Sequence, residues 1–321
     1  MTIARFRRCA LALYATLTLA GCGGTPMLPL GTGALSPVAR NAMPAWMAPQ
    51  AKSGDLLYLS NIASGSVDVF SYPQLRQVGK LTGFGAPRSE CVDRKGDVWI
   101  ADVQGYDVIE YPHGATKPIV ALSTPGAPHG CSVNPKSGDL AVTGGVGGVI
   151  LAVYHRTKHG IWLDPKEYTD SSIRSVAFCG YDAQGNLFVD GLDKTKGGTF
   201  RLAELPNHAT ALVDLSVNQS IAGAGQVQWD GSALAVGDTG VTPSVVYQFS
   251  VSGSMATRIG STSLGQSKSI RQFWIDRARV IGPDFDADVG VWNYPAGGSP
   301  VKRIGAVRGY GSAISLAAGS K

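Results

Sequence analysis

The chain has 321 residues, 44% of them hydrophobic and 16% charged, with a formal net charge of +5. Three of its 28 basic residues (Arg5, Arg7 and Arg8) lie in the first 21 residues, which contain no acid, so 25 basic residues stand against 23 acidic ones beyond them. These basic residues are scattered and are not interleaved with stacking aromatics, which argues against a nucleic-acid partner.

Residues 1–21 have the features of an export signal. The arginines are followed by an apolar stretch, Cys9–Ala20, which is too short to span a bilayer comfortably. The stretch ends in Leu19–Cys22, which resembles the bacterial lipobox. That resemblance implies cleavage before Cys22 and a lipid anchor on this cysteine; an ordinary secretory signal is the alternative. Gly23 follows the cysteine, and in similar lipoproteins this residue favours outer-membrane sorting if the host has two membranes.

Residues 22–53 are rich in Gly, Pro, Ala and Met and contain no acidic residue. Such a composition, without hydrophobic periodicity, predicts a lipidated and flexible tether. In the alternative interpretation, Met43, Trp46 and Met47 pack on the folded domain or on a membrane surface.

Residues 54–321 repeat one pattern six times: a turn, a β-rich run, a gap and a second β-rich run. The first five turns contain Gly54, Gly96, Gly138, Gly185 and Gly231, spaced by 42, 42, 47 and 46 residues, and a sixth copy starts at Arg279. A period of about 40–50 residues made of short strands is typical of a β-propeller with four strands per blade. No segment has helical periodicity long enough for a crossover, so the sequence predicts an all-β, six-bladed β-propeller.

The ring is expected to close through the C-terminus. A short β-rich run precedes each turn in blades two to six and forms the innermost strand, as in Cys91–Asp93 and Trp274–Asp276. The first blade has no such run before Gly54, whereas a matching run, Gly311–Leu316, lies near the C-terminus. The C-terminal strand is therefore predicted to complete the first blade.

Three cysteines remain beyond the tether: Cys91, Cys131 and Cys179. Because innermost strands of neighbouring blades usually diverge, and a disulfide needs Cα atoms within about 7 Å, buried free thiols are expected. A Cys131–Cys179 bridge is the alternative.

Polar residues at two repeated positions are expected to surround one mouth of the central channel, because both positions lie on the same face of a propeller. The ends of the second strands supply Asn61, Asp102, Asp238 and Asp284, and the segments entering the innermost strands supply Arg88, Glu90, His129 and Arg174. Together they could bind a cation or polarise a substrate. Alternatively, each aspartate caps its turn by accepting backbone N–H groups.

Asp284, Asp286 and Asp288 are spaced like the front of a calcium-binding loop, in which oxygen ligands alternate. Gly290 comes one residue late for such a loop, and no glutamate follows at the twelfth position. A divalent cation such as calcium is therefore a candidate ligand, and a solvated acidic loop is the alternative.

The segments Gly54–Asn61 and Gly96–Asp102 resemble NHL repeats and the related SMP-30/gluconolactonase-like six-bladed propellers over residues 54–317. Phe178–Asp182, Val227–Gly231 and Trp292–Gly298 are similar to a group of uncharacterised bacterial propeller lipoproteins. In the SMP-30 group a divalent cation is held by Glu, two Asn and Asp, roles for which Glu90, Asn61 and Asp238 are the candidates.

The expected function is that of a binding or scaffolding module at the cell envelope, monomeric and anchored to a membrane through Cys22, with a protein or small-molecule ligand. The alternatives are a metal-dependent lactone or ester hydrolase with its site at the channel mouth, and a purely structural envelope protein.

Overall fold

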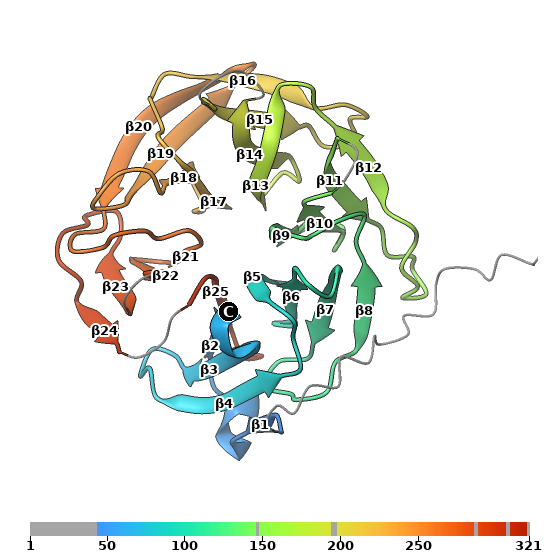
Figure 1. The fold of residues 1–321 in the computed structure, drawn as a ribbon, viewed down its shortest axis with the longest axis vertical. Coiled ribbons are helices and arrows are strands. Elements are labelled where there is room, and N and C mark those ends of the chain that lie inside the picture. Colours follow the sequence, from blue (N-terminus) through green and yellow to red (C-terminus); the bar gives the residue numbers. More distant parts are fainter. Residues whose placement is uncertain (1–43, 146–147, 194–197, 286–287, 306–308, 320–321) are drawn as a thin grey trace, which may run out of the picture. The chain divides into compact units, whose positions relative to one another are not determined.

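The described part of the chain consists of antiparallel β-sheets arranged around a common axis (Figure 1). The computed structural model describes residues 44–145, 148–193, 198–285, 288–305 and 309–319, which all belong to one structural unit, residues 31–321. Its helices are two short 3-10 turns, Pro49–Lys52 and Ile62–Ser64. Over these ranges the all-β prediction is confirmed, and none of their helices is long and apolar enough to cross a bilayer.

The first sheet contains the strands from both ends of the described chain. Its order is β1 (Trp46–Met47), β4 (Gln77–Thr82), β3 (Ser66–Ser71), β2 (Leu56–Asn61) and β25 (Ser312–Ser315). The C-terminal strand β25 runs antiparallel to β2, with Leu57 opposite Ile314 and Leu59 opposite Ser312. The predicted pairing of the C-terminal run with the first sheet is therefore confirmed.

Part of the predicted tether belongs to this sheet. Strand β1 pairs with β4, placing Met47 opposite Gly79, and Ala51 is 1% exposed. A Cβ atom at residue 79 would collide with the sulfur of Met47, so the glycine leaves room for this side chain. The last residues of the predicted tether thus lie in a short strand and a 3-10 turn. The packing alternative fits Met47, whereas Trp46 pairs through its backbone and its side chain stays exposed; Met43 lies outside the described residues.

The next two sheets are four-stranded meanders. The second has the order β5 (Pro87–Val92), β6 (Val98–Asp102), β7 (Asp107–Tyr111) and β8 (Val120–Ser123). The third has the order β9 (Gly130–Val133), β10 (Leu140–Thr143), β11 (Val149–Tyr154) and β12 (Lys166–Thr169). In each, the earliest strand lies nearest the axis (Figure 1).

The following eight strands form one continuous sheet. It consists of β13 (Ile173–Tyr181), β14 (Leu187–Asp193), β15 (Phe200–Leu205) and β16 (Val213–Val217), then β20 (Met255–Ser263), β19 (Val245–Ser252), β18 (Leu234–Asp238) and β17 (Ala224–Trp229). Its two antiparallel halves meet through a parallel pairing of β16 with β20 at Ser216–Met255 and Val217–Ala256. The last sheet is β21 (Trp274–Asp276), β22 (Arg279–Pro283), β23 (Val289–Asn293) and β24 (Lys302–Ile304).

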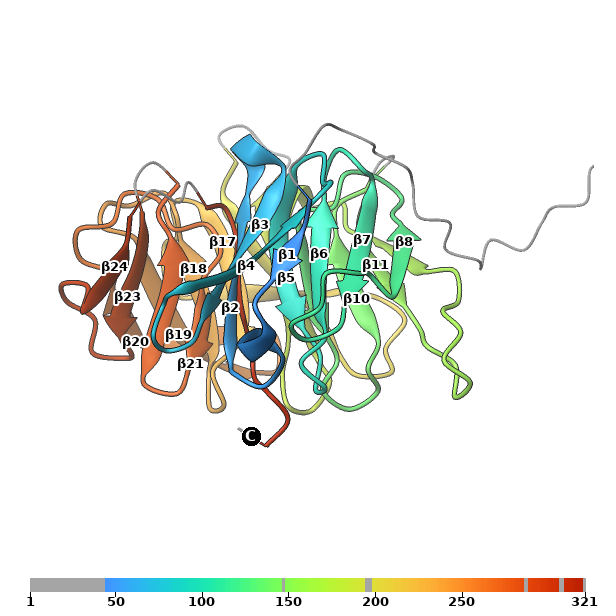
Figure 2. The same ribbon diagram turned by 90° about the horizontal axis from the view of Figure 1, so that it is seen from below.

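The core lies between the faces of neighbouring sheets. Strands such as β2 and β6 read as nearly continuous apolar runs, which is the pattern of strands covered on both faces. Tyr58 of β2 and Ile100 of β6 belong to one buried cluster, and Trp99 and Trp292 are almost fully buried. The edge-on view in Figure 2 shows these strands running roughly parallel to the axis.

A disulfide joins the second and third sheets. Cys91 of β5 and Cys131 of β9 are bridged, with Cα atoms 5.7 Å apart, while Cys179 is a buried free thiol. The prediction of free thiols is wrong for the first two cysteines, and so is the alternative Cys131–Cys179 bridge. The innermost strands do not diverge at this level, because they lie side by side close to the axis, where the sheets are nearest to one another (Figure 1).

Candidate functional site

Three of the predicted channel-mouth aspartates hold the backbone of their own sheets. Each lies at or just beyond the end of a second strand and is buried, and its carboxylate accepts N–H groups from the segment that leads into the innermost strand. Asp102 accepts from Gly85 and Ala86 (2.6 and 2.6 Å), Asp238 from Ala222, Gly223 and Gly240 (3.1, 3.0 and 3.0 Å), and Asp284 from Lys268 and Ser269 (2.8 and 3.0 Å).

This arrangement matches the capping alternative. The carboxylate oxygens are occupied by amide donors, which stabilise the ionised form and fix the loop geometry. Asn61 plays a related part, because its side chain accepts from the N–H of Ser64 and caps the short 3-10 turn that follows β2. These four residues therefore shape the loops around the channel and do not present a converging set of ligand atoms.

Asp190 lies in β14, the second strand of its half of the eight-stranded sheet, and it also accepts a backbone N–H group. The sequence did not predict it as a site residue. One oxygen accepts from the N–H of Phe178 (2.8 Å), and the backbone amide of Gly225 lies near the carboxyl group. Burial raises the pKa of Asp190 well above its usual value, and the amide donor opposes this shift only in part.

Replacing Asp238 by alanine is expected to lower the free energy of unfolding by about 1–3 kcal/mol, because it removes the acceptor of three N–H groups. Chemical denaturation would measure the change, with the exposed Asp164→Ala as the matched control. Equal stabilities of the two variants would show that Asp238 does not hold the loop.

The predicted residues Arg88 and His129 do come together, beside a set of side chains that repeat analysis did not single out. The guanidinium of Arg88 lies 5.0 Å from the centre of the Tyr310 ring, and that of Arg271 lies 5.5 Å from the same ring. Arg271 also lies 5.0 Å from the ring of Phe285, which meets Tyr310 edge to face at 6.2 Å. We call Arg88, His129, Arg271, Phe285 and Tyr310 the arginine–aromatic cluster.

The cluster draws on four neighbouring sheets, and His129, directly before β9, comes from the third sheet. Arg88 is in β5. Arg271 lies before β21, Phe285 lies after β22, and Tyr310 lies two residues before the start of β25. The loop position of Tyr310 is fixed by hydrogen bonds to strand β2, since its N–H donates to the carbonyl of Ser60. The cluster therefore lies where the ends of the innermost strands of these sheets approach the axis.

The cluster is cationic. Nη1 of Arg88 lies 3.4 Å from Nδ1 of His129, and burial together with the charge of Arg88 lowers the pKa of His129, which favours its neutral form. A neutral His129 can accept this hydrogen bond. Within the described ranges neither Arg88 nor Arg271 has a carboxylate at ion-pair distance.

Glu90 lies two residues beyond Arg88 and is fully buried. Neither of its carboxyl oxygens has a hydrogen-bond partner among the described residues, and one lies directly against the backbone of Gly311. Burial raises the pKa of Glu90 well above its usual value, with Ser60 nearby as a smaller opposing influence. The raised pKa favours the neutral form of Glu90 beside Arg88. The side chain of Arg174 lies outside the described residues.

The predicted calcium loop is only partly described, because Asp286 lies outside the described residues. Asp284 is occupied by backbone amides, as above, and Asp288 forms an ion pair with Arg303. Two of the three proposed carboxylates therefore already have partners, which favours the alternative of an acidic loop without a cation.

The donor set that the SMP-30 resemblance implies does not fit a divalent cation here. Of its candidates, Asn61 and Asp238 have their side chains committed to backbone amides, and Glu90 is buried against Gly311. In the described residues the one group of acids with metal-like spacing is Asp93, Asp97 and Glu110, whose ligand atoms lie within 4.8 Å of one another.

This acidic group lies at the other end of β5 from Arg88. Asp93 accepts from the backbone of Lys95 and Asp97 and closes a local turn, whereas Asp97 accepts from the backbone of His113, which follows β7. Burial raises the pKa of Glu110 to about 7. The geometry of these acids follows from the turn between β5 and β6, and we assign them no ligand.

No protein-family model matches the chain, and no curated protein is similar to it in sequence. Its structure is similar to a chain of a nidogen/laminin complex, at 12% identity and a TM-score of 0.66, over 82% of this chain and 99% of that one. A functionally unknown protein from Desulfotomaculum acetoxidans DSM 771 (13% identity, TM-score 0.55) and a protein of unknown function from Bacteroides caccae (9%, 0.59) match over the same shares of the chains. At identities this low, the structural similarity shows only the fold, a β-propeller. The function has to be inferred from the site.

Proposed function

We propose that this protein is a lipid-anchored β-propeller of the cell envelope that binds an anionic ligand at the arginine–aromatic cluster. The eight-stranded sheet counts as two four-stranded blades joined at β16 and β20, which gives six blades in all. The repeat motifs favour kinship with NHL and SMP-30-like propellers, and the lipobox-like Leu19–Cys22 supports the anchor. We further propose that the protein is a monomer and that, if the host has two membranes, it is located on the outer membrane or faces the periplasm.

The observation that carries the proposal is the pair of guanidinium groups on one aromatic ring. Arg88 and Arg271 both lie over Tyr310 within 5.5 Å. Each guanidinium is positively charged, and an anion that reaches both would be attracted by two charges at once. Arginine is also well suited to carboxylates and phosphates, because its planar fork can donate two parallel hydrogen bonds.

The hydrolase alternative has less support. A metal-dependent mechanism needs carboxylate and amide oxygens that are free to converge on one ion, whereas Asp102, Asp238 and Asp284 hold backbone amides. The arginine–aromatic cluster is cationic, so it is better suited to bind an anion than a metal cation.

Arg88→Gln and Arg271→Gln are each expected to raise the dissociation constant for citrate, a small polyanion, about tenfold, since each removes one charge-assisted contact. Isothermal titration of the purified soluble domain at low ionic strength would measure this. The exposed Arg76→Gln is the matched control, because it removes the same charge from a side chain outside the cluster that forms no ion pair with a described residue. Unchanged citrate binding in both test variants would refute the assignment of the site.

Cys22→Ala is expected to abolish lipid attachment and cleavage after Gly21, because the thiol carries the first acyl-bearing group in lipoproteins of this type. Metabolic labelling with a fatty acid and partitioning into detergent would test the variant against the wild type. Since each buried methylene contributes about 0.8 kcal/mol to membrane binding, loss of the chains should release the protein from membranes. A variant that still carries label would contradict the anchor and leave the channel-mouth proposal untouched.

A further inference from the structure

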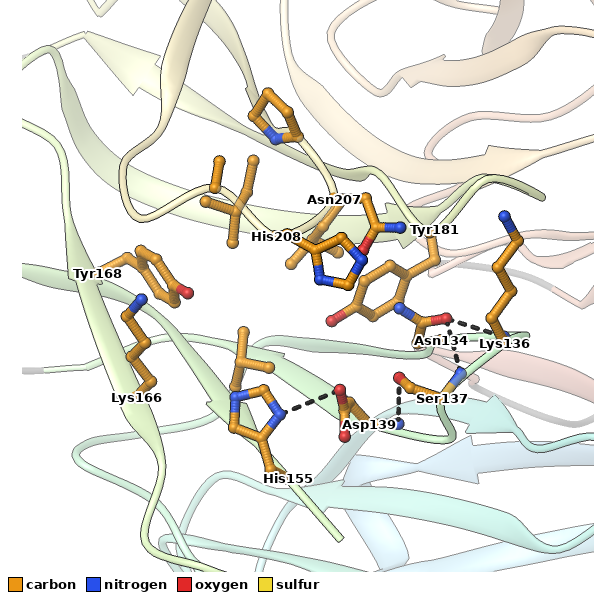
Figure 3. Close-up of a pocket in the computed structure, with 16 residues that line it drawn as sticks. Asn134, Lys136, Ser137, Asp139, His155, Lys166, Tyr168, Tyr181, Asn207 and His208 are labelled. Carbon is orange, nitrogen blue, oxygen red and sulfur yellow. Dashed lines mark hydrogen bonds and ion pairs between the residues drawn. The ribbon is translucent and has the colours of Figure 1, made fainter.

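A pocket of about 450 Å³ opens between the third sheet and the β13–β16 half of the eight-stranded sheet (Figure 3). It lies at the opposite end of β9 from the arginine–aromatic cluster, because His129 precedes this strand and the pocket residue Asn134 follows it. The volume falls in the range of about 300–1,000 Å³ that is usual for small-molecule sites.

The pocket combines an apolar base with a polar rim. Val153, Leu187 and Leu205 line it together with the rings of Tyr168 and Tyr181. The polar side chains come from the turn after β9, from β11 and β12, and from the turn between β15 and β16, so two sheets must pack together to form the site. Apolar bases with a few converging polar groups are typical of ligand pockets.

The groups left uncommitted in this pocket are mainly hydrogen-bond donors. Figure 3 shows the hydroxyls of Tyr168 and Tyr181 pointing into the space between His155 and His208. In the described structure no hydrogen bond is made by either hydroxyl. Lys136 and Lys166 have no carboxylate at ion-pair distance, and the ammonium of Lys166 lies 5.0 Å from the centre of the Tyr168 ring. Burial raises the pKa of Tyr181, which keeps its hydroxyl protonated and able to donate.

The acceptors of the pocket, in contrast, are largely engaged. Asp139 pairs with His155 at 3.0 Å, and the side-chain oxygen of Asn134 accepts from the N–H groups of Lys136 and Ser137 at 2.8 and 3.2 Å. The one carboxylate among the lining residues therefore already has a partner, the imidazole of His155. The two lysines remain, and Figure 3 places them on opposite sides of the pocket.

We propose that this pocket is a second ligand site, which binds a small organic anion through a carboxylate or phosphate group. Tyr168, Tyr181 and the lysines donate to its oxygens, and the apolar base covers its carbon skeleton. The space is larger than a single inorganic ion needs, so the ligand is the size of a sugar acid or a sugar phosphate. This site is independent of the channel mouth.

The test compares three sugars that share one ring: glucuronate, glucose 6-phosphate and neutral glucose. Ligand-observed NMR and isothermal titration on the purified soluble domain should give a dissociation constant of about 1 mM or tighter for at least one of the acids. Glucose should bind at least tenfold more weakly. The tighter of the two acids identifies the anionic group as carboxylate or phosphate.

Two variants test the location. Tyr181→Phe removes one hydroxyl and keeps the ring, and Lys166→Gln removes one charge; each should weaken binding of the acid at least fivefold. The exposed Lys117→Gln, on the loop before β8, is the matched control and should bind like the wild type, as should Arg88→Gln.

Binding of neither acid, equal binding of glucose, or wild-type affinity in both pocket variants would each overturn the proposal. Loss of citrate binding in Arg88→Gln with sugar-acid binding intact would separate the two sites.

Discussion

Truncation after Val307 is expected to lower the free energy of unfolding by at least about 3 kcal/mol, because it removes β25 from the first sheet. The loss exposes the inner edge of β2 and the apolar faces that Ala313 and Ile314 bury, which are 0% and 3% exposed. It also removes the bond that the N–H of Ala317 donates to Asp55 at 2.8 Å. In a domain of this size the melting midpoint should fall by roughly 10 °C.

Thermal melting of the truncated chain against the full chain would measure the change. A stop after Ala318 is the matched control, since it removes only residues beyond the last buried position, Ala317. An unchanged midpoint in the longer truncation would mean that the C-terminal strand does not hold the ring together.

Removal of the Cys91–Cys131 bridge by the double substitution Cys91→Ala and Cys131→Ala is expected to destabilise the protein by roughly 3–5 kcal/mol. The bridge closes a segment with a sequence separation of 40 residues, and loops of that length lose a few kcal/mol of chain entropy in the unfolded state when cross-linked. The second and third sheets would then be joined near the axis by packing and by non-covalent contacts such as that between Arg88 and His129.

Denaturant unfolding with and without a reductant would test this effect. Reductant should lower the free energy of unfolding of the wild type and of the Cys179→Ala control to the same extent, because Cys179 is a free thiol. It should not change the free energy of unfolding of the double variant. A wild type that is insensitive to reductant throughout its unfolding transition would contradict a contribution from the bridge.

The repeats predicted much of the fold because each strand pattern is local. Apolar runs bounded by glycine and aspartate indicate strands, and the missing run before Gly54 pointed to the C-terminal partner at Gly311–Leu316. The pairing of β1 could not be read in the same way, since two residues, Trp46 and Met47, carry no periodicity. It depends on the space that Gly79 leaves on a strand about thirty residues away.

The candidate sites were less predictable, because their geometry depends on how different sheets approach. Arg88 and His129 stand at repeated positions and were expected at the channel. Arg271 and Tyr310 lie outside the repeat motifs, and only the closure of the ring brings them together. The disulfide likewise depends on the separation of inner strands, which a repeat pattern does not give.

The pairing at the outer rim also bears on how the protein resists aggregation. Among the described strands, β1 covers the outer edge of β4, and the parallel contact between β16 and β20 shields two further edges. Sheets also end at β8, β12 and β24, of which β12 and β24 carry lysine or arginine that discourages the addition of another strand. The uncharged segment Val120–Ser123 is thus the edge most open to intermolecular strand addition when many copies crowd together on one surface.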